Sequence, residues 1–553
     1  MFLHLLNNAN NIYTVSNQEE RMKNAGLIIF LVITVLLLSS CETPELDGTI
    51  VKEGVSGSGI ILDKKTLTLT IGAGERLGYT IGSDIKRQTL IWTSSDSNIA
   101  SVSSNGTVTA VNFSSGQHNN RYNTGGTADN PTTNPATGTA VITVRTNNNS
   151  FSDTITITTT TQPQVNMMTL PPLKDQFAGY FLIGNILRGP SEITGTGTSA
   201  VINNPHLTRH FNAITAENHM KPGYLITGRD AATGMFTWNS NNQATADNFV
   251  DAANNAGMKV IGHTLLWHSQ NANWMWNQIA SRAGVIAADM DKEKAIIIMK
   301  EYITEVVSRY KGKIHTWDVL NEIFPDNASS NANWKDAMRR NASGEGQDAN
   351  PWYVAIGSDF VYEGFLAARL ADPNAILYYN DYNTDMSNRA RLIRDMVQEV
   401  NNKYLTGTDK PAGENPGRLL IEGIGMQEHH NNGISASSIR NTINMFRPLG
   451  VRLSVSELDI IAYPNYGAFS GAGGAEINQN HNSTVTNQAL ITQANLYGEY
   501  MKLYIENSDI IERISIWGVI DNLSWRSRGL PLLFDHSGKA KPAYYRFVGA
   551  LNN

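Results

Sequence analysis

Two glutamates stand at the ends of apolar segments, among residues that suit chemistry on a sugar. Glu322 ends a segment that starts at Trp317, and Glu457 lies between Ser456 and Leu458. Cleavage of a glycosidic bond needs one carboxylic acid to protonate the leaving oxygen and one carboxylate to meet the anomeric carbon. The two glutamates are therefore candidates for these two roles.

Amide, imidazole, ammonium and indole groups end the neighbouring apolar segments. Amides and charged groups can orient sugar hydroxyls, and an indole ring offers a flat apolar surface to the C–H face of a sugar. Ten candidates follow or end such segments: Glu217, Asn218, Lys221, His263, Trp267, Gln270, Asn321, Gln427, His429 and Trp517. A fold that gathers them around the two glutamates would bind a glycan at the point of cleavage.

The C-terminal part of the chain has a pattern that could gather them. Strands that alternate with helices favour a parallel sheet, and eight strands over residues 175–553 predict a closed (β/α)8 barrel, the TIM-barrel class of α/β fold. Functional residues of such a barrel lie at the carboxyl ends of its strands. The predicted strands are Tyr180–Ile186, Phe211–Thr215, Lys259–Thr264, Ile314–Leu320, Ala375–Tyr379, Leu420–Met426, Arg452–Val455 and Ile514–Ile516.

An open, doubly wound sheet is the alternative. Such a sheet usually has a glycine-rich phosphate turn between a strand and a helix. Gly471, Gly473 and Gly474 do not lead from a strand directly into a helix. The barrel is therefore favoured.

Two of the helices can be predicted from the spacing of apolar residues. The first has one apolar face, formed by Ile296, Met299, Ile303, Val306, Val307 and Tyr310. The second runs from about Phe360 to Ala368 and ends at Asp372-Pro373, because proline cannot continue a helix.

Residues 59–161 have a different pattern. Leu67 and Leu69 alternate with threonine, as do Ile155 and Ile157, and this period of two predicts half-buried antiparallel strands. Asn105-Gly106 predicts a tight hairpin in which both residues have positive φ. We therefore expect a small all-β sandwich ahead of the barrel.

The segments Trp92–Val102 and Gly106–Val111 resemble the bacterial Ig-like group 2 module. The resemblance extends over the β-rich region and implies a spacer or adhesion role, of which a spacer is the simpler expectation. Residues 162–174 contain proline and are predicted to link this module to the barrel. Residues 42–58 are predicted to be a flexible spacer.

The first 41 residues have the pattern of an export signal. Arg21 and Lys23 precede an uncharged run from Ala25 to Ser40, which is too short for a comfortable membrane span. Cys41, the only cysteine, stands where the bacterial lipobox requires it. The resemblance implies a lipoprotein signal peptide and a lipid on Cys41. The protein would then be anchored to the bacterial outer membrane, facing the cell surface.

The composition excludes other classes of protein. Lys and Arg number 43 and Asp and Glu 49, which gives a net charge of −6 without basic blocks. This balance argues against a nucleic-acid partner. One cysteine cannot form a disulfide framework within the chain. His263 and His268 have neither helical spacing nor a third ligand, so we expect no metal and no cofactor.

The C-terminal motifs, taken together, resemble glycoside hydrolase family 10, the retaining endo-1,4-β-xylanases. In family order they are Glu217-Asn218-x-Met220-Lys221, Gly262-His263-Thr264-Leu265-x-Trp267-His268-Ser269-Gln270, Trp317-Asp318-Val319-x-Asn321-Glu322, Asn380-Asp381-Tyr382-Asn383, Gly423-Ile424-Gly425-x-Gln427-x-His429, Glu457-Leu458-Asp459-Ile460, Trp517-Gly518-Val519-x-Asp521 and Lys541-Pro542-Ala543-Tyr544-Tyr545.

This resemblance implies a role for each candidate. Glu322 resembles the general acid/base and Glu457 the nucleophile. Asn321 would hold the 2-hydroxyl of the sugar at the cleaved bond, with Gln427 beside it, and His429 would orient Glu457. His263 would contact hydroxyls of the same sugar. The remaining implied roles are binding of that sugar and of the next one toward the non-reducing end by Glu217, Asn218, Lys221 and Gln270, cleft walls from Trp267, Trp517 and Trp525, and a leaving-group side at Tyr382.

The chain departs from the family pattern in three places. Pro222 stands where many members have an aromatic residue, and the loop from Tyr463 to Gln479 is expanded. Glu428 replaces a small residue between Gln427 and His429, and it is expected to place an acid near the nucleophile.

The sequence therefore predicts a monomeric, surface-tethered endo-1,4-β-xylanase that cleaves xylan and xylo-oligosaccharides by a retaining double displacement. A β-1,4-glucanase or mixed-linkage glucanase on the same fold is one alternative, and its site would have to accommodate a C5 hydroxymethyl group. A non-catalytic surface glycan-binding protein is the other alternative, although the presence of both glutamates argues against it.

Overall fold

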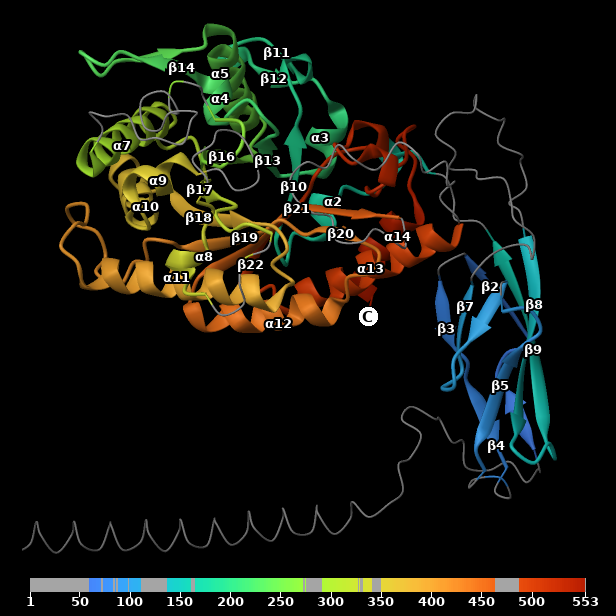
Figure 1. Cartoon of the computed structure of the whole chain (residues 1–553). Coiled ribbons are helices and arrows are strands. Elements are labelled where there is room, and N and C mark those ends of the chain that lie inside the picture. Colours follow the sequence, from blue (N-terminus) through green and yellow to red (C-terminus); the bar gives the residue numbers. More distant parts are fainter. Residues whose placement is uncertain are drawn as a thin grey trace, which may run out of the picture.

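The computed structural model describes residues 59–70, 73–82, 85, 88–97, 99–110, 137–160, 165–271, 274, 291–326, 328, 332–340, 350–462 and 487–552. Within these residues the chain forms a β-rich region followed by a barrel (Figure 1). The predicted signal peptide, Cys41, the spacer at 42–58 and the expanded loop after Tyr463 lie outside the described residues.

The barrel consists of eight parallel strands. Each strand pairs with the next in sequence, and the last pairs with the first, so the sheet is closed. The predicted (β/α)8 barrel is thereby confirmed. Its strands are β10 (Leu182–Leu187), β13 (Ala213–Ala216), β16 (Lys259–Leu266), β17 (Thr316–Asn321), β18 (Ile376–Asp381), β19 (Gly423–Met426), β21 (Arg452–Ile461) and β22 (Ile511–Ile516).

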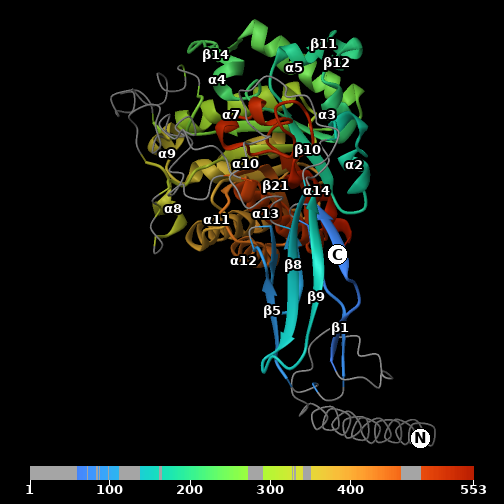
Figure 2. The ribbon, with the colours of Figure 1, turned by 90° about the vertical axis from the view of Figure 1, so that its right-hand side faces the viewer.

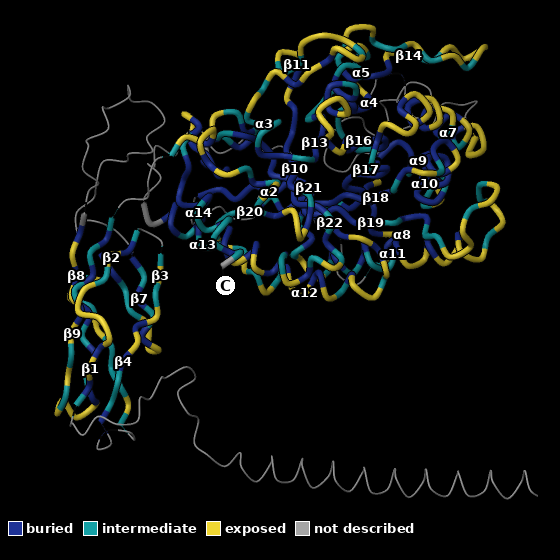
Figure 3. Tube along the Cα trace, turned by 180° about the vertical axis from the view of Figure 1, so that it is seen from behind, coloured by how far each residue is buried: buried dark blue, intermediate teal, exposed yellow. Residues whose placement is uncertain are grey.

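Helices surround the strands in Figure 1, and the exposed residues in Figure 3 lie mainly on their outer faces. Each barrel strand is followed by one of the helices α3 (Pro205–His210), α5 (Ser240–Asn255), α7 (Lys292–Arg309), α10 (Asp359–Ala371), α11 (Ser387–Thr406), α12 (Ala436–Phe446), α13 (Asn487–Glu506) and α14 (Pro542–Gly549). Further elements are α2 (Leu173–Gln176), α4 (Pro222–Leu225), α8 (Trp334–Ala337), α9 (Pro351–Ile356), β11 (Ile193–Thr194), β12 (Val201–Ile202), β14 (Ile226–Arg229), β15 (Phe236–Trp238) and β20 (His429–Asn431).

The two helices predicted from apolar spacing are α7 and α10. In α7 the predicted face is buried except for Ile296, which is partly exposed. Helix α10 ends at Ala371, directly before Asp372-Pro373, as expected. Among the described helices none is both long enough and apolar enough to cross a bilayer.

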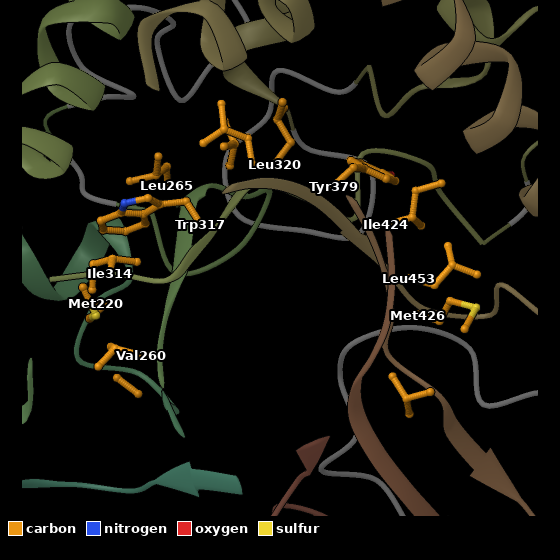
Figure 4. Close-up of a cluster of buried hydrophobic side chains, with 14 of the residues drawn as sticks. Met220, Val260, Leu265, Ile314, Trp317, Leu320, Tyr379, Ile424, Met426 and Leu453 are labelled. Carbon is orange, nitrogen blue, oxygen red and sulfur yellow. The ribbon is translucent and has the colours of Figure 1, made fainter. Parts of the chain in front are cut away.

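Large side chains fill the space between strands and helices, as Figure 4 shows for Trp317, Leu320 and Tyr379. Trp317 is fully buried and occupies the place that a side chain at residue 262 would need. A Cβ on Gly262 would lie 2.1 Å from the Trp317 ring. Close packing of this kind makes the barrel wall stiff, so side chains at the strand ends have defined positions.

Residues 165–174, which belong to the predicted linker, pack against the barrel. Met167 and Leu173 are fully buried in its core, and Asn166 forms a β-bridge with Lys539. Apolar burial thus draws this stretch onto the barrel although its prolines and polar residues resemble a linker.

The N-terminal region is all β, as predicted, with a separate core that contains Ile142, Val144, Ile155 and Ile157. Figure 2 shows β5, β8 and β9 side by side. Its sheets are β1–β4, β2–β9–β8–β5 and β3–β7–β6. The strands are β1 (Ile60–Leu62), β2 (Thr66–Thr70), β3 (Gly74–Arg76), β4 (Tyr79–Ile81), β5 (Leu90–Ser94), β6 (Ala100–Val102), β7 (Thr107–Ala110), β8 (Thr137–Thr146) and β9 (Ser152–Thr160).

Two details of this region differ from expectation. Strands β2 and β9 pair in parallel, although alternation predicted antiparallel pairing throughout. The hairpin between β6 and β7 exists, but only Gly106 has positive φ, at +80°. Four residues connect the strands instead of two, so Asn105 does not need the left-handed conformation.

Candidate functional site

A cleft lies among the carboxyl ends of the barrel strands. The structure brings all fourteen predicted cleft residues into its lining, together with Asn383. The lining consists of Glu217, Asn218, Lys221, His263, Trp267, Gln270, Asn321, Glu322, Tyr382, Asn383, Gln427, His429, Glu457, Trp517 and Trp525. Residues from seven different strand ends or loops therefore share one concave surface.

Register shifts in the sheet occur beside the cleft. The pairing shifts between His263 and Leu266 on β16, and between Val455 and Leu458 on β21. Such irregularities re-aim side chains that a regular strand would direct elsewhere. Glu457 lies within one of these shifts, so the local strand geometry directs it into the cleft.

Glu322 follows directly after β17. Its φ of +56° turns the chain, so that Asn321 and Glu322 both line the cleft although they are consecutive. Its Oε1 accepts a hydrogen bond from Gln427 Nε2 at 2.8 Å, and its Oε2 accepts one from Trp267 Nε1 at 2.8 Å. The side chain is mostly buried, with two donors from the cleft wall.

Glu457 also has a partner on each oxygen. Oε1 accepts from Asn380 Nδ2 at 2.8 Å, and Oε2 accepts from His429 Nε2 at 3.2 Å. Burial alone would raise the pKa of Glu457, but these hydrogen bonds and the charges of His263 and His429 hold it below the usual range. The carboxylate form is therefore favoured.

A chain of amides connects the two carboxyl groups. Asn380 Nδ2 donates to Asn321 Oδ1 at 2.9 Å as well as to Glu457. Gln427 Nε2 donates to the same Asn321 oxygen at 3.2 Å as well as to Glu322. Both glutamates thus belong to one hydrogen-bond network in one cleft.

His429 lies between two carboxylates. Its Nδ1 donates to Asp459 Oδ2 at 2.9 Å while Nε2 faces Glu457. Burial would lower the pKa of His429, but Asp459 and Glu457 raise it to about 9. Burial would raise the pKa of Asp459, but Arg526 and His429 lower it to about 2. At neutral pH the imidazolium therefore donates to both carboxylates.

The second cleft histidine, His263, has a carboxylate partner of its own. Its Nδ1 lies 2.9 Å from Asp318 Oδ2, and its ring meets Trp517 edge to face, with the ring centroids 5.7 Å apart. A neighbouring imidazole, His268, has its pKa lowered by burial to about 4 and stands 3.7 Å from Glu322 Oε2 as a neutral group.

One wall of the cleft is a polar cluster beside an indole ring. Lys221 Nζ donates to Gln270 Oε1 at 2.7 Å and to Asn218 Oδ1 at 3.1 Å, and it lies 4.7 Å from the centroid of the Trp267 ring. Burial lowers the pKa of Lys221 to about 8, although Glu457 and the other glutamates of the cleft act in the opposite direction. Burial raises the pKa of Glu217.

Tyr382 is connected to Glu322 through an arginine. Arg339 Nη2 donates to the Tyr382 hydroxyl at 2.9 Å, and Arg339 Nε donates to the backbone oxygen of Glu322 at 2.8 Å. The Tyr382 hydroxyl donates to Asp326. The Arg389 guanidinium lies 4.4 Å from the centroid of the Tyr382 ring. Tyr382 thus has a defined position on the same cleft.

Three residues that hold the site together have no role predicted from the sequence. Asn380 contacts Glu457, Asp459 contacts His429, and Asp318 contacts His263. All three lie inside the recognised motifs, on the strands that carry the assigned residues. The signal was therefore available, but the partner of each could be known only from the assembled barrel.

The expectation for Glu428 was wrong. Its side chain does not line the cleft beside the nucleophile candidate; it is buried on the opposite side of the chain. There it accepts hydrogen bonds from His430, Thr384 and Tyr504. Residues 427 and 429 face the cleft, so residue 428 faces away from it.

The arrangement suits acid–base and nucleophilic chemistry by two carboxyl groups. Among the described residues, no group of three or more His, Cys, Asp and Glu side chains is arranged to hold a metal ion. The cleft offers paired carboxyl groups, hydroxyl-binding amides and indole faces, which are the groups that glycosidic cleavage uses.

Comparisons with known proteins agree with this geometry. Residues 172–550 match the model of Glycosyl hydrolase family 10. Endo-1,4-beta-xylanase A of Thermotoga neapolitana is 31% identical over 383 residues, which are 68% of this chain and 31% of that protein. The endo-1,4-beta-xylanase of Geobacillus stearothermophilus is 30% identical over 388 residues, covering 69% of this chain and 98% of that enzyme.

A solved structure extends the similarity beyond the barrel. The crystal structure of a bacterial Ig-like domain containing GH10 xylanase from termite gut has a TM-score of 0.64 at 46% identity. It covers 88% of this chain and 98% of that one, whereas this chain spans less than a third of the Thermotoga protein. The family match includes every described residue of the cleft, and the chain therefore belongs to glycosyl hydrolase family 10.

Proposed function

We propose that this chain is an endo-1,4-β-xylanase that retains the configuration at the anomeric carbon. The observation that carries the proposal is the placement of Glu322 and Glu457 in one cleft, joined by the amides of Asn321, Asn380 and Gln427. The similarity to enzymes named endo-1,4-beta-xylanase supports xylan as the substrate.

In the first step Glu457 attacks the anomeric carbon. A bond forms between its carboxylate oxygen and that carbon, and the glycosidic C–O bond breaks while Glu322 gives its proton to the leaving oxygen. The lowered pKa of Glu457 supports this role, because the nucleophile must be ionised. In the second step Glu322 removes a proton from water, which displaces Glu457 and restores both groups.

The surrounding residues would hold the sugar. Asn321, with Gln427 beside it, would bind the 2-hydroxyl of the sugar at the cleaved bond, and such a hydrogen bond strengthens toward the transition state. His429 orients Glu457. All of the following residues line the cleft. His263 would contact hydroxyls of the same sugar, and Glu217, Asn218, Lys221 and Gln270 would bind that sugar and the next one toward the non-reducing end. Trp267, Trp517 and Trp525 would form the walls, and Tyr382 would contact the leaving-group side.

The first experiment compares substrates and follows the anomer released. Purified protein should cleave xylan well and carboxymethylcellulose poorly, and proton NMR should detect the β-anomer before mutarotation. Initial release of the α-anomer would contradict double displacement. Faster cleavage of carboxymethylcellulose than of xylan would assign the cleft to a glucanase instead.

The second experiment identifies the nucleophile. A 2-deoxy-2-fluoro xylobioside with a good leaving group should accumulate as a covalent adduct, since the fluorine slows the second step. Peptide mass spectrometry should place the adduct on Glu457, and Glu457→Ala should neither form it nor cleave xylan. Glu322→Gln should lower the rate on xylan by about 10²–10⁴-fold, and less on a substrate that needs no acid. An adduct on another residue would refute the assignment.

For the N-terminal part we propose a lipoprotein signal at residues 1–41, a lipid on Cys41 and an Ig-like spacer that holds a monomeric enzyme away from the outer membrane. The β-rich region and the similarity to the termite-gut enzyme support the Ig-like assignment. Cys41→Ser should release the enzyme from the membrane fraction, and globomycin should alter the size of the parent protein. An unchanged membrane fraction for Cys41→Ser would refute the anchor.

A further inference from the structure

Glu428 lies between two cleft residues that contact different glutamates. Gln427 Nε2 donates to Glu322 Oε1 at 2.8 Å, and His429 Nε2 lies 3.2 Å from Glu457 Oε2. The backbone of Glu428 has a φ of +59°, in the left-handed region that residues with a Cβ rarely adopt. This conformation costs free energy, so other contacts must hold it.

The Glu428 side chain supplies such contacts, in addition to the backbone hydrogen bonds from Asp459 N to Glu428 O at 3.3 Å and from Glu457 N to Gln427 O at 3.1 Å. It is 1% exposed, and its carboxylate accepts hydrogen bonds from three parts of the chain. Tyr504 on α13 donates to Oε2 at 3.2 Å, Thr384 after β18 donates to Oε1 at 3.2 Å, and His430 Nε2 donates to Oε2 at 2.6 Å. The carboxylate thus ties the turn to a helix and to a neighbouring loop.

The groups that hold Glu428 are themselves fixed. The backbone oxygen of Thr384 accepts from Thr442 Oγ1 on α12 at 2.6 Å. The backbone oxygen of His430 accepts from Arg526 Nη1 at 3.1 Å, and Arg526 also pairs with Asp459, the partner of His429. The cluster around Glu428 is therefore continuous with the contacts that orient His429.

We propose that Glu428 is a positioning residue. Its anchored carboxylate holds the left-handed turn that directs Gln427 toward Glu322 and His429 toward Glu457 at the same time. The proposal rests on the function proposed above for those two glutamates. Glycine adopts positive φ without strain, so glycine at this position needs no side-chain hydrogen bonds to keep the turn. Alanine lacks these hydrogen bonds and is strained at positive φ.

The test compares Glu428→Ala with Glu428→Gly. Both are measured as kcat and KM on xylan per active site counted with the fluoro-xylobioside, and as pH profiles of kcat/KM. Glu428→Ala should lower kcat by about tenfold or more with little change in KM. It should also move the acidic limb of the profile to higher pH, because His429 no longer holds Glu457 in its carboxylate form. Glu428→Gly should keep most of the parent's kcat and most of the parent's pH profile.

A matched control is Glu422→Ala. Glu422 precedes β19, at the opposite end of the strand from the cleft, and pairs with Arg369 and Arg418. Its loss should lower the melting temperature and leave kcat per titrated site and the pH profile unchanged. A shift of the acidic limb in this variant as large as that in Glu428→Ala would attribute the effect to general destabilisation and overturn the proposal.

Two further outcomes overturn it. One is a Glu428→Ala enzyme with the parent's kcat and pH profile, and the other is equal impairment of the alanine and glycine variants. Should Glu428→Ala not fold, Glu428→Met replaces it, since a thioether side chain of similar length cannot accept these three hydrogen bonds and the same changes are expected. A parent protein that does not cleave xylan would instead refute the proposed function.

Discussion

Asn380 Nδ2 lies 2.8 Å from Oε1 of Glu457, on the oxygen that His429 does not contact. Asn380 belongs to β18 and Glu457 to β21, so this contact reaches across β19, which lies between them in the barrel sheet. Ser456 Oγ donates to the Asn380 side-chain oxygen at 2.6 Å and fixes the orientation of the amide. One carboxylate thus depends on groups from several strands.

Asn380→Ala should lower kcat on xylan by about ten- to hundredfold, the effect of losing a hydrogen bond to a charged group. The change should affect KM less, since Asn380 does not line the cleft. Steady-state kinetics per titrated active site measure it. The control is Asn401→Ala, which removes another buried asparagine bonded to the backbone of Ile421. An Asn380→Ala enzyme no slower than this control would contradict the role.

His429→Gln should move the acidic limb of kcat/KM to higher pH. In the proposed mechanism Glu457 must be ionised to attack. Burial alone would raise the pKa of Glu457, but the hydrogen bond from His429 and its other partners lower it below the usual range. Glutamine keeps a donor but loses the positive charge, so the pKa of Glu457 rises and activity disappears sooner as the pH falls. A pH series of initial rates shows this, with His206→Gln on α3 as control. An unmoved limb would argue against the imidazolium.

Asp459→Asn should destabilise the fold most between about pH 4 and 6.5. The pKa of Asp459 falls from 3.8 to about 2, so its contribution is present above pH 3.8 and is lost as the pH falls. The pKa of His429 rises from 6.5 to about 9, so its contribution is present below pH 6.5 and is lost as the pH rises. Removing one partner of such a buried set costs about 3–5 kcal/mol. Denaturant unfolding at several pH values measures the difference, which should shrink outside this range.

Gly223→Ala should raise KM with a smaller effect on kcat. The Gly223 amide donates to the backbone oxygen of Gln270 at 2.8 Å, and a Cβ there would lie 2.6 Å from that oxygen. The backbone at residue 223 or at Gln270 would have to shift, which would disturb the hydrogen bond from Lys221 to the Gln270 side chain, the pair proposed above to bind sugar. Kinetics on xylo-oligosaccharides of increasing length should show the raised KM. The control is Gly179→Ala, where a Cβ meets nothing within 4 Å, and it should leave KM unchanged.

Much of the architecture could be predicted because the spacing of apolar residues depends on the local periodicity of strands and helices. Eight runs of strand length with helical patterns between them leave few ways to bury both faces of a parallel sheet. Helix α10 ended where Asp372-Pro373 predicted, since proline acts on the backbone itself. Some strand bounds differ from the prediction: β19 begins at Gly423 instead of Leu420, because Leu420 is buried without joining the ladder.

Other features depended on neighbours that are distant in sequence. The prolines and polar residues of 165–174 suggested a linker, yet Met167 and Leu173 are buried against the barrel. Asn105-Gly106 suggested a two-residue turn, but the pairing of β6 with β7 left four residues in the connection. In both places long-range burial and pairing outweighed local propensity.

The sequence by itself determined the fold class and the set of polar side chains at the strand ends, because periodicity and strand order bring those ends to one rim. Only the tertiary structure decided which partner each side chain has. Glu428 follows Gln427 directly and yet faces away from the cleft, while Asn380 and Glu457, far apart in the chain, form a hydrogen bond. A side chain's direction depends on local φ and ψ and on the packing behind it, and both are settled only when the barrel closes.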